Sequence, residues 1–291
     1  MKVLVIGSDG QLGLEFQNFS NSYNSLSWVF STIKTLDLLK LDTISFFLNN
    51  INPSVIVNCA AYTNVDKAET ESKLANTINY KAVDIISKWT NENNKKLIHV
   101  STDYVFNGIS KLPLYENSIT NPVNEYGRSK LKGEQVCLKN DANSVVIRTS
   151  WLYSSFGKNF VKTMIILMKS KEEINVVNDQ VGSPTSTRSL VALIFRIIGN
   201  KTASGIFHWS DGAEITWYDF AIEIQEQAFD KGILKSKIPI RPTETSAYPT
   251  LAKRPPYSTL DRGKTLEKFG ADVMSWKEEL KRVIDEIAKA G

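Results

Sequence analysis

Five short apolar runs in the first half of the chain restrict its possible folds more than any other feature. Each has the length of a β-strand and is rich in valine and isoleucine; the runs cover residues 2–7, 26–31, 54–60, 96–101 and 144–151. They do not alternate apolar with polar residues, which is typical of strands buried on both faces of a parallel sheet. Longer segments of helical periodicity, such as residues 71–93, separate them. This alternation predicts an α/β fold with a doubly wound, Rossmann-type parallel sheet.

Composition excludes several classes of protein. The chain has 291 residues, 42% hydrophobic and 23% charged, which is ordinary for a globular protein. Its net charge of +4 suits an anionic small molecule but is too weak to indicate nucleic acid. Because no apolar stretch reaches about 18 residues, we expect no membrane span. Cys59 and Cys137 are too few for a disulfide framework, and no secretory signal precedes the first strand, so we expect the cytoplasm.

A glycine triplet follows the first strand directly. In "KVLVIGSDGQLGLEF", Gly7, Gly10 and Gly13 have the spacing of a dinucleotide-binding turn. Glycines permit a tight turn and close approach of the backbone to a pyrophosphate, and the positive end of the next helix favours the anion. The triplet alone could be a structural turn, but its place at the first strand-to-helix junction favours a cofactor site. We expect Gly7, Gly10, Gln11, Leu12 and Gly13 there.

The end of the second strand bears on the choice of cofactor. It reads "WVFSTIKT", with Ser31, Thr32 and Lys34 and no acidic residue before Asp37. An acid there would bind the ribose 2′-hydroxyl of NAD and repel a 2′-phosphate, whereas hydroxyls and a cation tolerate the phosphate. The pattern therefore favours NADPH, with NADH as the alternative cofactor. The other interpretation is that these residues form a polar loop that does not contact the cofactor. We also expect Asp37 and Leu38 at the adenine.

The segment "NEYGRSKLKGEQ" places Tyr126 and Lys130 four residues apart on a predicted helix, hence on one face. Alone, this would more often be a surface pair. Here the glycine turn and "STDYVF", at the end of the fourth strand, point to the same crevice. A lysine ammonium would lower the pKa of the phenol and make it a better general acid, and Thr102 could polarise a substrate carbonyl. We therefore predict Thr102, Tyr126 and Lys130 as catalytic residues, with help from Asn58.

The later part of the chain has a different organisation. Residues 173–179 and 205–211 resemble strands, a helix is expected to open at residues 184–186, and Thr216 is a plausible N-cap for the next helix. We expect residues 1–150 to form the dinucleotide-binding domain, with segments around 173–200 returning to it. Residues 151–291 would form most of a smaller, interleaved α/β substrate domain.

With these features in place, the chain resembles the dTDP-4-dehydrorhamnose reductase family of the extended short-chain dehydrogenase/reductase superfamily, over nearly its whole length. The matching stretches are "GSDGQLG", "VIVNCAAYTNVDKAE", "STDYVFNG", "NEYGRSKLKGE", "IRTSWLY", "NDQVGSPT", "TWYDFA" and "AYPTLAKRP". The resemblance implies NADPH-dependent reduction of the C4 ketone of dTDP-4-dehydro-6-deoxy-L-mannose to dTDP-L-rhamnose, with Tyr126 as general acid. We also expect Ala60, Ala61 and Thr63 at the cofactor.

The resemblance also implies substrate contacts. Trp151 matches a tryptophan that packs on the sugar ring; the alternative is a core residue. We expect the substrate set to comprise Thr102, Asp103, Tyr126, Trp151, Asn159, Asn178, Gln180 and Arg254. A guanidinium binds phosphate in bidentate fashion, so Arg254 would face the diphosphate; otherwise it is a solvated charge.

The match fails at one place. Some members of the family form a Mg²⁺-bridged dimer through carboxylates, and Glu15 matches one of them. Arg188 falls where another acid is needed, and an arginine repels a divalent cation. We therefore predict no metal site and no Mg²⁺-bridged dimer, although a homodimer is compatible with the sequence.

Two other functions remain open at this stage. One is a reductase of a different 4-keto-6-deoxy nucleotide sugar. The other is a non-catalytic, NADP-binding regulatory subunit, which the intact set of Thr102, Tyr126 and Lys130 disfavours. We expect His99 and His208 to be buried sheet or core residues, and Trp217 to pack between helix and sheet.

Overall fold

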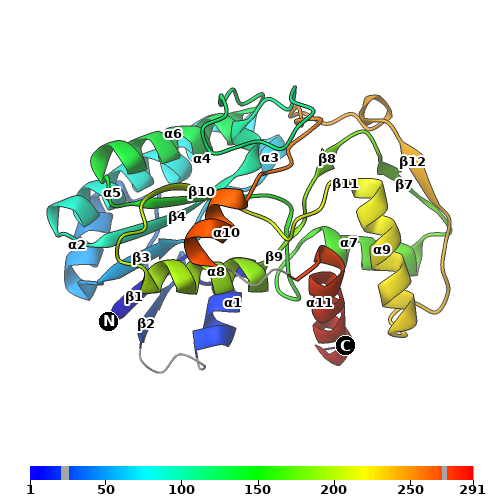
Figure 1. Cartoon of the computed structure of the whole chain (residues 1–291), viewed down its shortest axis with the longest axis horizontal. Helices are drawn as coiled ribbons and strands as arrows, with labels where there is room; N and C mark the ends of the chain where they lie inside the picture. The colour runs from blue at the N-terminus through cyan, green and yellow to red at the C-terminus, as the bar shows by residue number, and fades with distance from the viewer. Residues whose placement is uncertain (21–25, 271–273, 291) are drawn as a thin grey trace.

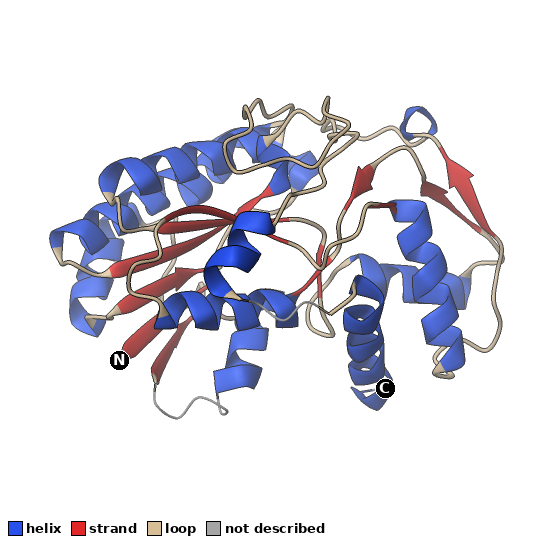
Figure 2. Cartoon of the chain, viewed as in Figure 1, coloured by secondary structure: helices blue, strands red, loops and turns tan. Residues whose placement is uncertain are grey.

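The first part of the chain is built around a parallel sheet. The structure is a computed structural model that describes residues 1–20, 26–270 and 274–290. Within those residues the strand order of the sheet is β10-β5-β4-β3-β1-β2, and every neighbouring pair is parallel (Figures 1 and 2). The strands are β1 (Lys2–Ile6), β2 (Ser27–Ser31), β3 (Val55–Asn58), β4 (Lys96–Thr102), β5 (Val145–Thr149) and β10 (Gly205–Trp209). The predicted α/β fold class and the five strands of the first half are confirmed.

The strand order places a switch point beside β1. The chain passes from β1 to β2 on one side and returns to β3 on the other side. In open α/β sheets, ligands bind in the crevice at the carboxyl ends of the strands at such a point. β1, β3 and β5 are buried along almost their whole length, as their unbroken apolar character predicts.

Helices cover both faces of the sheet. On one face the core contains side chains of α1 (Gln11–Ser20), α8 (Thr187–Gly199) and α10 (Gly263–Phe269). On the other it contains side chains of α2 (Leu41–Ile51), α5 (Ala82–Glu92) and α6 (Glu125–Asn140). Short helices α3 (Val65–Ala68), α4 (Ser72–Asn76) and η2 (Asp103–Val105) lie near the carboxyl ends of the strands. The long helix predicted at 71–93 is α4 and α5 joined through a π-helical turn, η1 (Thr77–Lys81).

A second part has its own apolar core, drawn from α7, β7, α9, β12 and α11. Within the described residues, three two-stranded pairings complete it: β11 with β8, β12 with β7, and β6 with β9. Its elements are β6 (Leu152–Tyr153), α7 (Phe160–Ser170), β7 (Ile174–Val177), β8 (Val181–Gly182), β9 (Thr185–Ser186), β11 (Ile215–Thr216), α9 (Trp217–Asp230), β12 (Ile240–Thr243), η3 (Thr245–Ala247) and α11 (Trp276–Ala290). Thr216 caps α9 in a capping box, as predicted. The helix expected to open at 184–186 begins at Thr187, because β9 pairs with β6 and Ser186 is the N-cap.

The two parts are interleaved along the sequence, because the chain passes from one to the other more than once after residue 150. Within the segment 173–200, β7 belongs to the second core whereas α8 packs on the main sheet. β10, which we expected in the substrate domain, is an edge strand of the main sheet, and α10 packs with it. We therefore propose that the dinucleotide-binding domain comprises the chain through β5 together with α8, β10 and α10.

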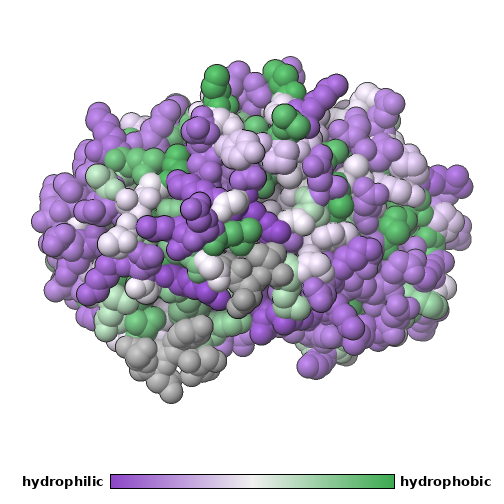
Figure 3. Space-filling model, in the orientation of Figure 1, coloured by the Kyte–Doolittle hydropathy of each residue, from purple (hydrophilic) through white to green (hydrophobic). Residues whose placement is uncertain are grey.

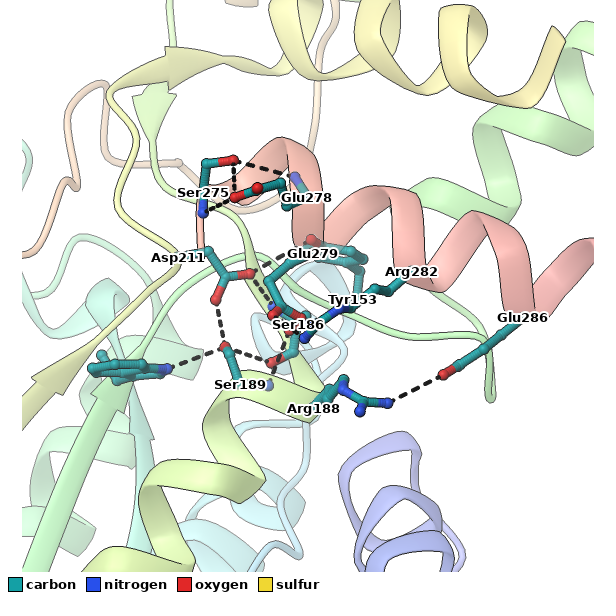
Figure 4. A network of polar contacts seen from close by, with 11 residues as sticks. Tyr153, Ser186, Arg188, Ser189, Asp211, Ser275, Glu278, Glu279, Arg282 and Glu286 are labelled. Atoms are coloured by element: carbon teal, nitrogen blue, oxygen red, sulfur yellow. Dashed lines mark hydrogen bonds and ion pairs between the residues drawn. The ribbon is translucent and has the colours of Figure 1, made fainter. Parts of the chain in front are cut away.

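A buried polar network joins the two parts (Figure 4). Asp211 accepts hydrogen bonds from the Ser186 backbone N–H, at 2.7 Å, and from the Ser189 hydroxyl. The Ser186 hydroxyl donates to Glu279 on α11, at 2.8 Å, and the Tyr153 hydroxyl lies 3.5 Å from Asp211. We call Tyr153, Ser186, Ser189, Asp211 and Glu279 the seam cluster. Burial raises the pKa of Asp211 to about 7.

The outer surface carries no continuous apolar band on the face drawn in Figure 3, where hydrophobic residues are scattered among hydrophilic ones. Within residues 1–20, 26–270 and 274–290, we find no helix with the length and apolar character needed to span a bilayer.

Candidate active site

A cavity of about 760 Å³ lies at the carboxyl ends of β1, β3 and β4 and reaches the second part of the chain. This volume is within the range of small-molecule sites. It brings together most of the residues predicted from the sequence: Gly7, Gly10, Gln11, Leu12, Gly13, Asp37, Leu38, Ala60, Ala61, Thr63, Thr102, Asp103, Tyr126, Lys130 and Trp151.

The glycine turn is shaped by close packing at two of its three glycines. Gly7 has φ of +80°, and a Cβ there would lie 2.8 Å from the Ala60 backbone. A Cβ at Gly13 would lie 2.4 Å from the Gly7 carbonyl oxygen, whereas one at Gly10 would meet that oxygen at 3.4 Å. The turn leads directly into α1, whose first three residues line the cavity and bring the positive end of the helix to it. This backbone suits a dinucleotide pyrophosphate.

Ser31 and Thr32 are not brought to the cavity wall. The Ser31 carbonyl accepts from the Gly7 N–H at 2.9 Å, and its hydroxyl lies 3.0 Å from that of Thr35. Thr32 accepts through its hydroxyl from the Lys34 N–H at 3.2 Å. Both side chains thus serve the turn after β2, while Asp37 lines the cavity a few residues later.

Thr102 and Tyr126 lie together at the end of β4. The Thr102 hydroxyl donates to Asp103 at 3.0 Å and accepts from the Tyr104 N–H at 3.2 Å. The nearby Thr102 hydroxyl lowers the pKa of Tyr126, but burial has the larger effect and raises it to about 12. Burial also raises the pKa of Asp103 to about 6. Tyr126 is therefore a protonated phenol at neutral pH.

Lys130 does not act on Tyr126 in the way the spacing predicted. Its Nζ donates to the Val100 carbonyl at 2.7 Å and lies 3.5 Å from His99 Nε2. Burial lowers the pKa of Lys130 to about 8. Burial has the largest effect on both groups, and the neighbour that lowers the pKa of Tyr126 is Thr102 rather than Lys130.

Asn79, in the π-helical turn η1, is a buried residue that supports the site from behind the cavity lining and that the sequence reasoning missed. Its Oδ1 accepts from the Tyr62 N–H at 2.8 Å, and its Nδ2 donates to the Tyr62 carbonyl at 3.0 Å and the Ser129 hydroxyl at 2.9 Å. It thereby fixes the loop after β3 to α6, between Tyr126 and Lys130. A polar residue on the buried face of a helical run was the available signal. π-turns are frequent at functional sites.

Trp151 is held in an unusual conformation at the cavity. Its backbone has φ of +47°, a region that non-glycine residues seldom adopt. Its ring stacks on that of Trp217 with centroids 3.6 Å apart and an 11° angle between planes. A Cβ at Gly182 would lie 2.7 Å from the indole. Trp217 also lines the cavity. From the sequence we had expected it only to pack between helix and sheet.

Four expected substrate residues lie outside the cavity lining: Asn159, Asn178, Gln180 and Arg254. Asn159 caps α7 by accepting from the Lys162 N–H at 3.2 Å. Gln180 is buried and donates to the Thr245 hydroxyl at 2.9 Å. Asn178 is exposed. In this structure the side chains of Asn159 and Gln180 stabilise the second part of the chain.

Arg254 forms a bidentate ion pair with Asp66 on α3, at 2.7 Å and 2.6 Å. The guanidinium holds the pKa of Asp66 at about 2. It also hydrogen-bonds Tyr104, whose ring meets that of Tyr126 edge-on at 5.7 Å. Arg254 thus links the Pro-rich segment to the strand ends beside Tyr126.

Gln11 connects the glycine turn to the second part. Its Nε2 donates to the Leu152 carbonyl at 3.2 Å, and its Oε1 accepts from the Ser154 hydroxyl at 3.3 Å. Gly157 and Lys158 line the same end of the cavity, where Lys158 adds a cation that we had not predicted.

The two residues compared with the metal bridge, Glu15 and Arg188, have other partners. Glu15 is buried and accepts from the Thr187 hydroxyl at 2.6 Å. Arg188 lies 3.8 Å from Glu286 and over the ring of Phe19 (Figure 4 shows the Arg188–Glu286 pair). Among the described residues, no group of three or more His, Cys, Asp or Glu side chains could hold a metal ion.

Comparison with known proteins places these features in a family. The model of the RmlD substrate binding domain matches residues 1–289. A dTDP-4-dehydrorhamnose reductase of Escherichia coli K12 is 38% identical over 99% of this chain and 98% of its own. A crystal structure of such a reductase from Clostridium acetobutylicum superposes with a TM-score of 0.92 at 38% identity, covering 99% of both chains. One from Bacillus anthracis, in complex with NADP, gives 0.90 at 35% identity, covering 98% of this chain and 99% of that one. The chain belongs to the dTDP-4-dehydrorhamnose reductase family.

Proposed function

We propose that this chain reduces the C4 ketone of dTDP-4-dehydro-6-deoxy-L-mannose to dTDP-L-rhamnose with NADPH. The observation that carries the proposal is the meeting of the glycine turn with Thr102, Tyr126 and Lys130 in one cavity at the switch point of the sheet. The names of its relatives support the same reaction.

The residues that line the cavity support a place for each part of the cofactor. The turn at Gly7 and Gly13 and the start of α1 would hold the pyrophosphate, and Asp37 with Leu38 would hold the adenosine. When bound, the reduced nicotinamide supplies the hydride. NADPH is the expected form because β2 ends without an acidic side chain, and a relative binds NADP; NADH is the alternative.

The chain itself supplies the proton. The Tyr126 phenol stays protonated at neutral pH and can donate its proton to the carbonyl oxygen as negative charge develops there. The Thr102 hydroxyl, which lies near the phenol, can turn its own proton to the same oxygen. A buried site in which these donors are already in place stabilises the transition state more than water does.

The sugar would lie between these groups and Trp151. An aromatic face suits the C–H groups of a 6-deoxyhexose. Asp103 lies beside Thr102 and can hydrogen-bond a sugar hydroxyl. Both cysteines are free thiols, which fits our proposal that the chain acts in a reducing compartment, the cytoplasm.

The test is the loss of reduced-nicotinamide absorbance on mixing the protein with NADPH and dTDP-4-dehydro-6-deoxy-L-mannose. We expect turnover with dTDP-L-rhamnose as the product by chromatography. Matched assays with other 4-keto-6-deoxy nucleotide sugars test the alternative substrate. Binding of NADPH without oxidation with any of them would contradict an enzyme and favour a regulatory subunit.

A further inference from the structure

Two hydrogen-bond donors face opposite nitrogens of one buried imidazole behind the site. His99, on β4, has no exposed surface. Its Nδ1 lies 3.2 Å from Asn58 Nδ2, and its Nε2 lies 3.5 Å from Lys130 Nζ. A neutral imidazole has one N–H and one acceptor nitrogen. It cannot accept from both neighbours, so one of them must take the opposite role.

Asn58 is the neighbour whose orientation is fixed. Its Oδ1 accepts from the Ala60 N–H at 3.2 Å, and turning the amide over would set its NH₂ group against that N–H. Its Nδ2 therefore faces the imidazole, Nδ1 is the acceptor, and Nε2 carries the hydrogen. Burial and the nearby Lys130 hold the pKa of His99 well below its ordinary value, so the ring is neutral.

Lys130 Nζ consequently faces an N–H group. An ammonium has three donors and no lone pair, whereas a neutral amine has a lone pair that can accept from His99 Nε2. The other contact of Nζ, with the Val100 carbonyl, suits both forms because each can donate. The contact with His99 alone distinguishes them, and it favours the amine.

Other titratable groups facing Lys130 act in the opposite direction. Glu134 and Cys137 on its own helix, and Cys59 after β3, each favour the ammonium. The thiols are held neutral by burial, which raises their pKa values. Glu134 is paired with Arg148 on β5 at 2.8 Å, so much of its charge is balanced.

We propose, on the basis of the reductase function above, that His99 is a positioning residue that stabilises the neutral amine of Lys130 after Lys130 has returned a proton to Tyr126. When Tyr126 has protonated the substrate oxygen, an O–H bond forms on the phenolate as an N–H bond of the Lys130 ammonium breaks. The amine lone pair then accepts from His99 Nε2, and the amine regains its proton from a water molecule that enters the cavity, whose O–H bond breaks and which leaves to the solvent as hydroxide. No electrons move in this step.

The tautomers of the two histidines give a direct test. His208 Nδ1 lies 3.0 Å from the Leu114 carbonyl, to which it must donate, and its Nε2 lies 3.4 Å from Arg148 Nη1. The chain has 2 histidines, and they are thus expected to be opposite tautomers.

A two-bond ¹H–¹⁵N correlation spectrum of the ¹⁵N-histidine-labelled protein should show Nε2–H for His99 and Nδ1–H for His208, with His208→Gln assigning the signals. An Nδ1–H tautomer at His99 would overturn the proposal. The spectrum needs no turnover, so it stands apart from the test of the reaction.

Two matched variants test the role in the reaction. His99→Gln can accept from Asn58 through its carbonyl and present its NH₂ to Lys130, so the pH profile of kcat should match that of the unmodified chain. His99→Leu keeps the site apolar but removes the N–H, so the apparent pKa assigned to Lys130 in that profile should rise by about one unit. A purely structural role would lower activity without moving the profile, and an unmoved profile in His99→Leu would reject the proposal.

Discussion

Two buried polar clusters of this molecule differ in what their hydrogen bonds do. In the seam cluster, Asp211 and Glu279 accept from serines that belong to the elements they join. In the candidate catalytic cluster of Tyr126 and Lys130, Lys130 is buried and Tyr126 is partly buried, and both side chains line the cavity. The first arrangement holds the two parts of the chain together. The second keeps a phenol and an amine desolvated, and burial moves their pKa values apart, to about 12 for Tyr126 and about 8 for Lys130.

The difference shows that burial alone does not make a group reactive. Burial raises the pKa of Asp211 to about 7 and of Tyr126 to about 12 for the same reason, the cost of a charge away from water. Of these two residues, Tyr126 alone lines the cavity at the strand ends, where it can meet a substrate. The following experiments separate the two clusters, from the largest expected effect to the smallest.

Tyr126→Phe should have the largest effect on activity. It removes the hydroxyl that we propose as the proton donor and keeps the ring that packs on Tyr104. We expect kcat to fall by about 10²–10⁴-fold, the usual contribution of a general acid. NADPH affinity, measured by fluorescence titration, and the melting temperature should change little. Retention of most of the activity would remove Tyr126 from the mechanism.

Asp211→Asn should alter stability and its dependence on pH. The unfolded chain ionises this carboxyl near its ordinary pKa of 3.8, whereas the folded chain keeps the proton until about pH 7. The folded state therefore binds more protons between these values, and this group's contribution to stability falls as pH rises through them. The total change is a few kcal/mol.

Denaturant unfolding at several pH values checks this prediction. The decline between about pH 4 and 7 should be shallower in Asp211→Asn than in the unmodified chain. Asp42→Asn removes an exposed carboxylate on α2 and is the matched control. Parallel pH curves for all three proteins would show that Asp211 is not protonated in the folded chain.

Gly182→Ala tests the support of Trp151. The added methyl would lie 2.7 Å from the indole and must displace it from its stack on Trp217. Losing an aromatic contact costs about 0.5–1.5 kcal/mol, so we expect KM for the nucleotide sugar to rise by about three- to tenfold. NADPH affinity should not change. Gly199→Ala, where the methyl meets open space, is the control. Equal KM values would show that Trp151 does not touch the sugar.

The Arg254–Asp66 pair should give the smallest effect. Its side chains are 17% and 38% exposed, so solvent weakens the attraction. A double-mutant cycle of Arg254→Gln and Asp66→Asn should give a coupling free energy below about 1 kcal/mol. If Arg254 instead binds the diphosphate, as the sequence predicts, Arg254→Gln would raise KM for the sugar nucleotide whether or not Asp66 is present.

The sequence predicted features whose cause is local. Unbroken apolar runs predict strands buried on both faces, and the glycine spacing predicts the turn that Gly7 and Gly13 form by close packing. Tyr126 and Lys130 were found because a helix places residues four apart on one face. Asn159 could also have been predicted as an N-cap, since it directly precedes the apolar helix α7.

Features that depend on long-range packing were not predictable in this way. Trp217 stacks on Trp151 across 66 positions of the chain, and Asn79 bonds Ser129 across 50. The orientation of Lys130 toward His99 depends on which backbone and ring atoms surround it after folding. The exchange of β10 into the main sheet is likewise decided by the tertiary core that it completes.

Gly133 allows α6 to pack closely on its neighbour and so determines how deeply the Tyr126 phenol lies in the molecule. A methyl group at this position would lie 2.1 Å from the Asn79 carbonyl oxygen, so α6 touches the π-helical turn backbone to backbone. Any larger residue would push α6 outward and carry Tyr126 with it, and a misplacement of about 1 Å can cost roughly a hundredfold in rate. The lack of a side chain at Gly133, seven positions after Tyr126, therefore determines where the phenol lies relative to a bound substrate.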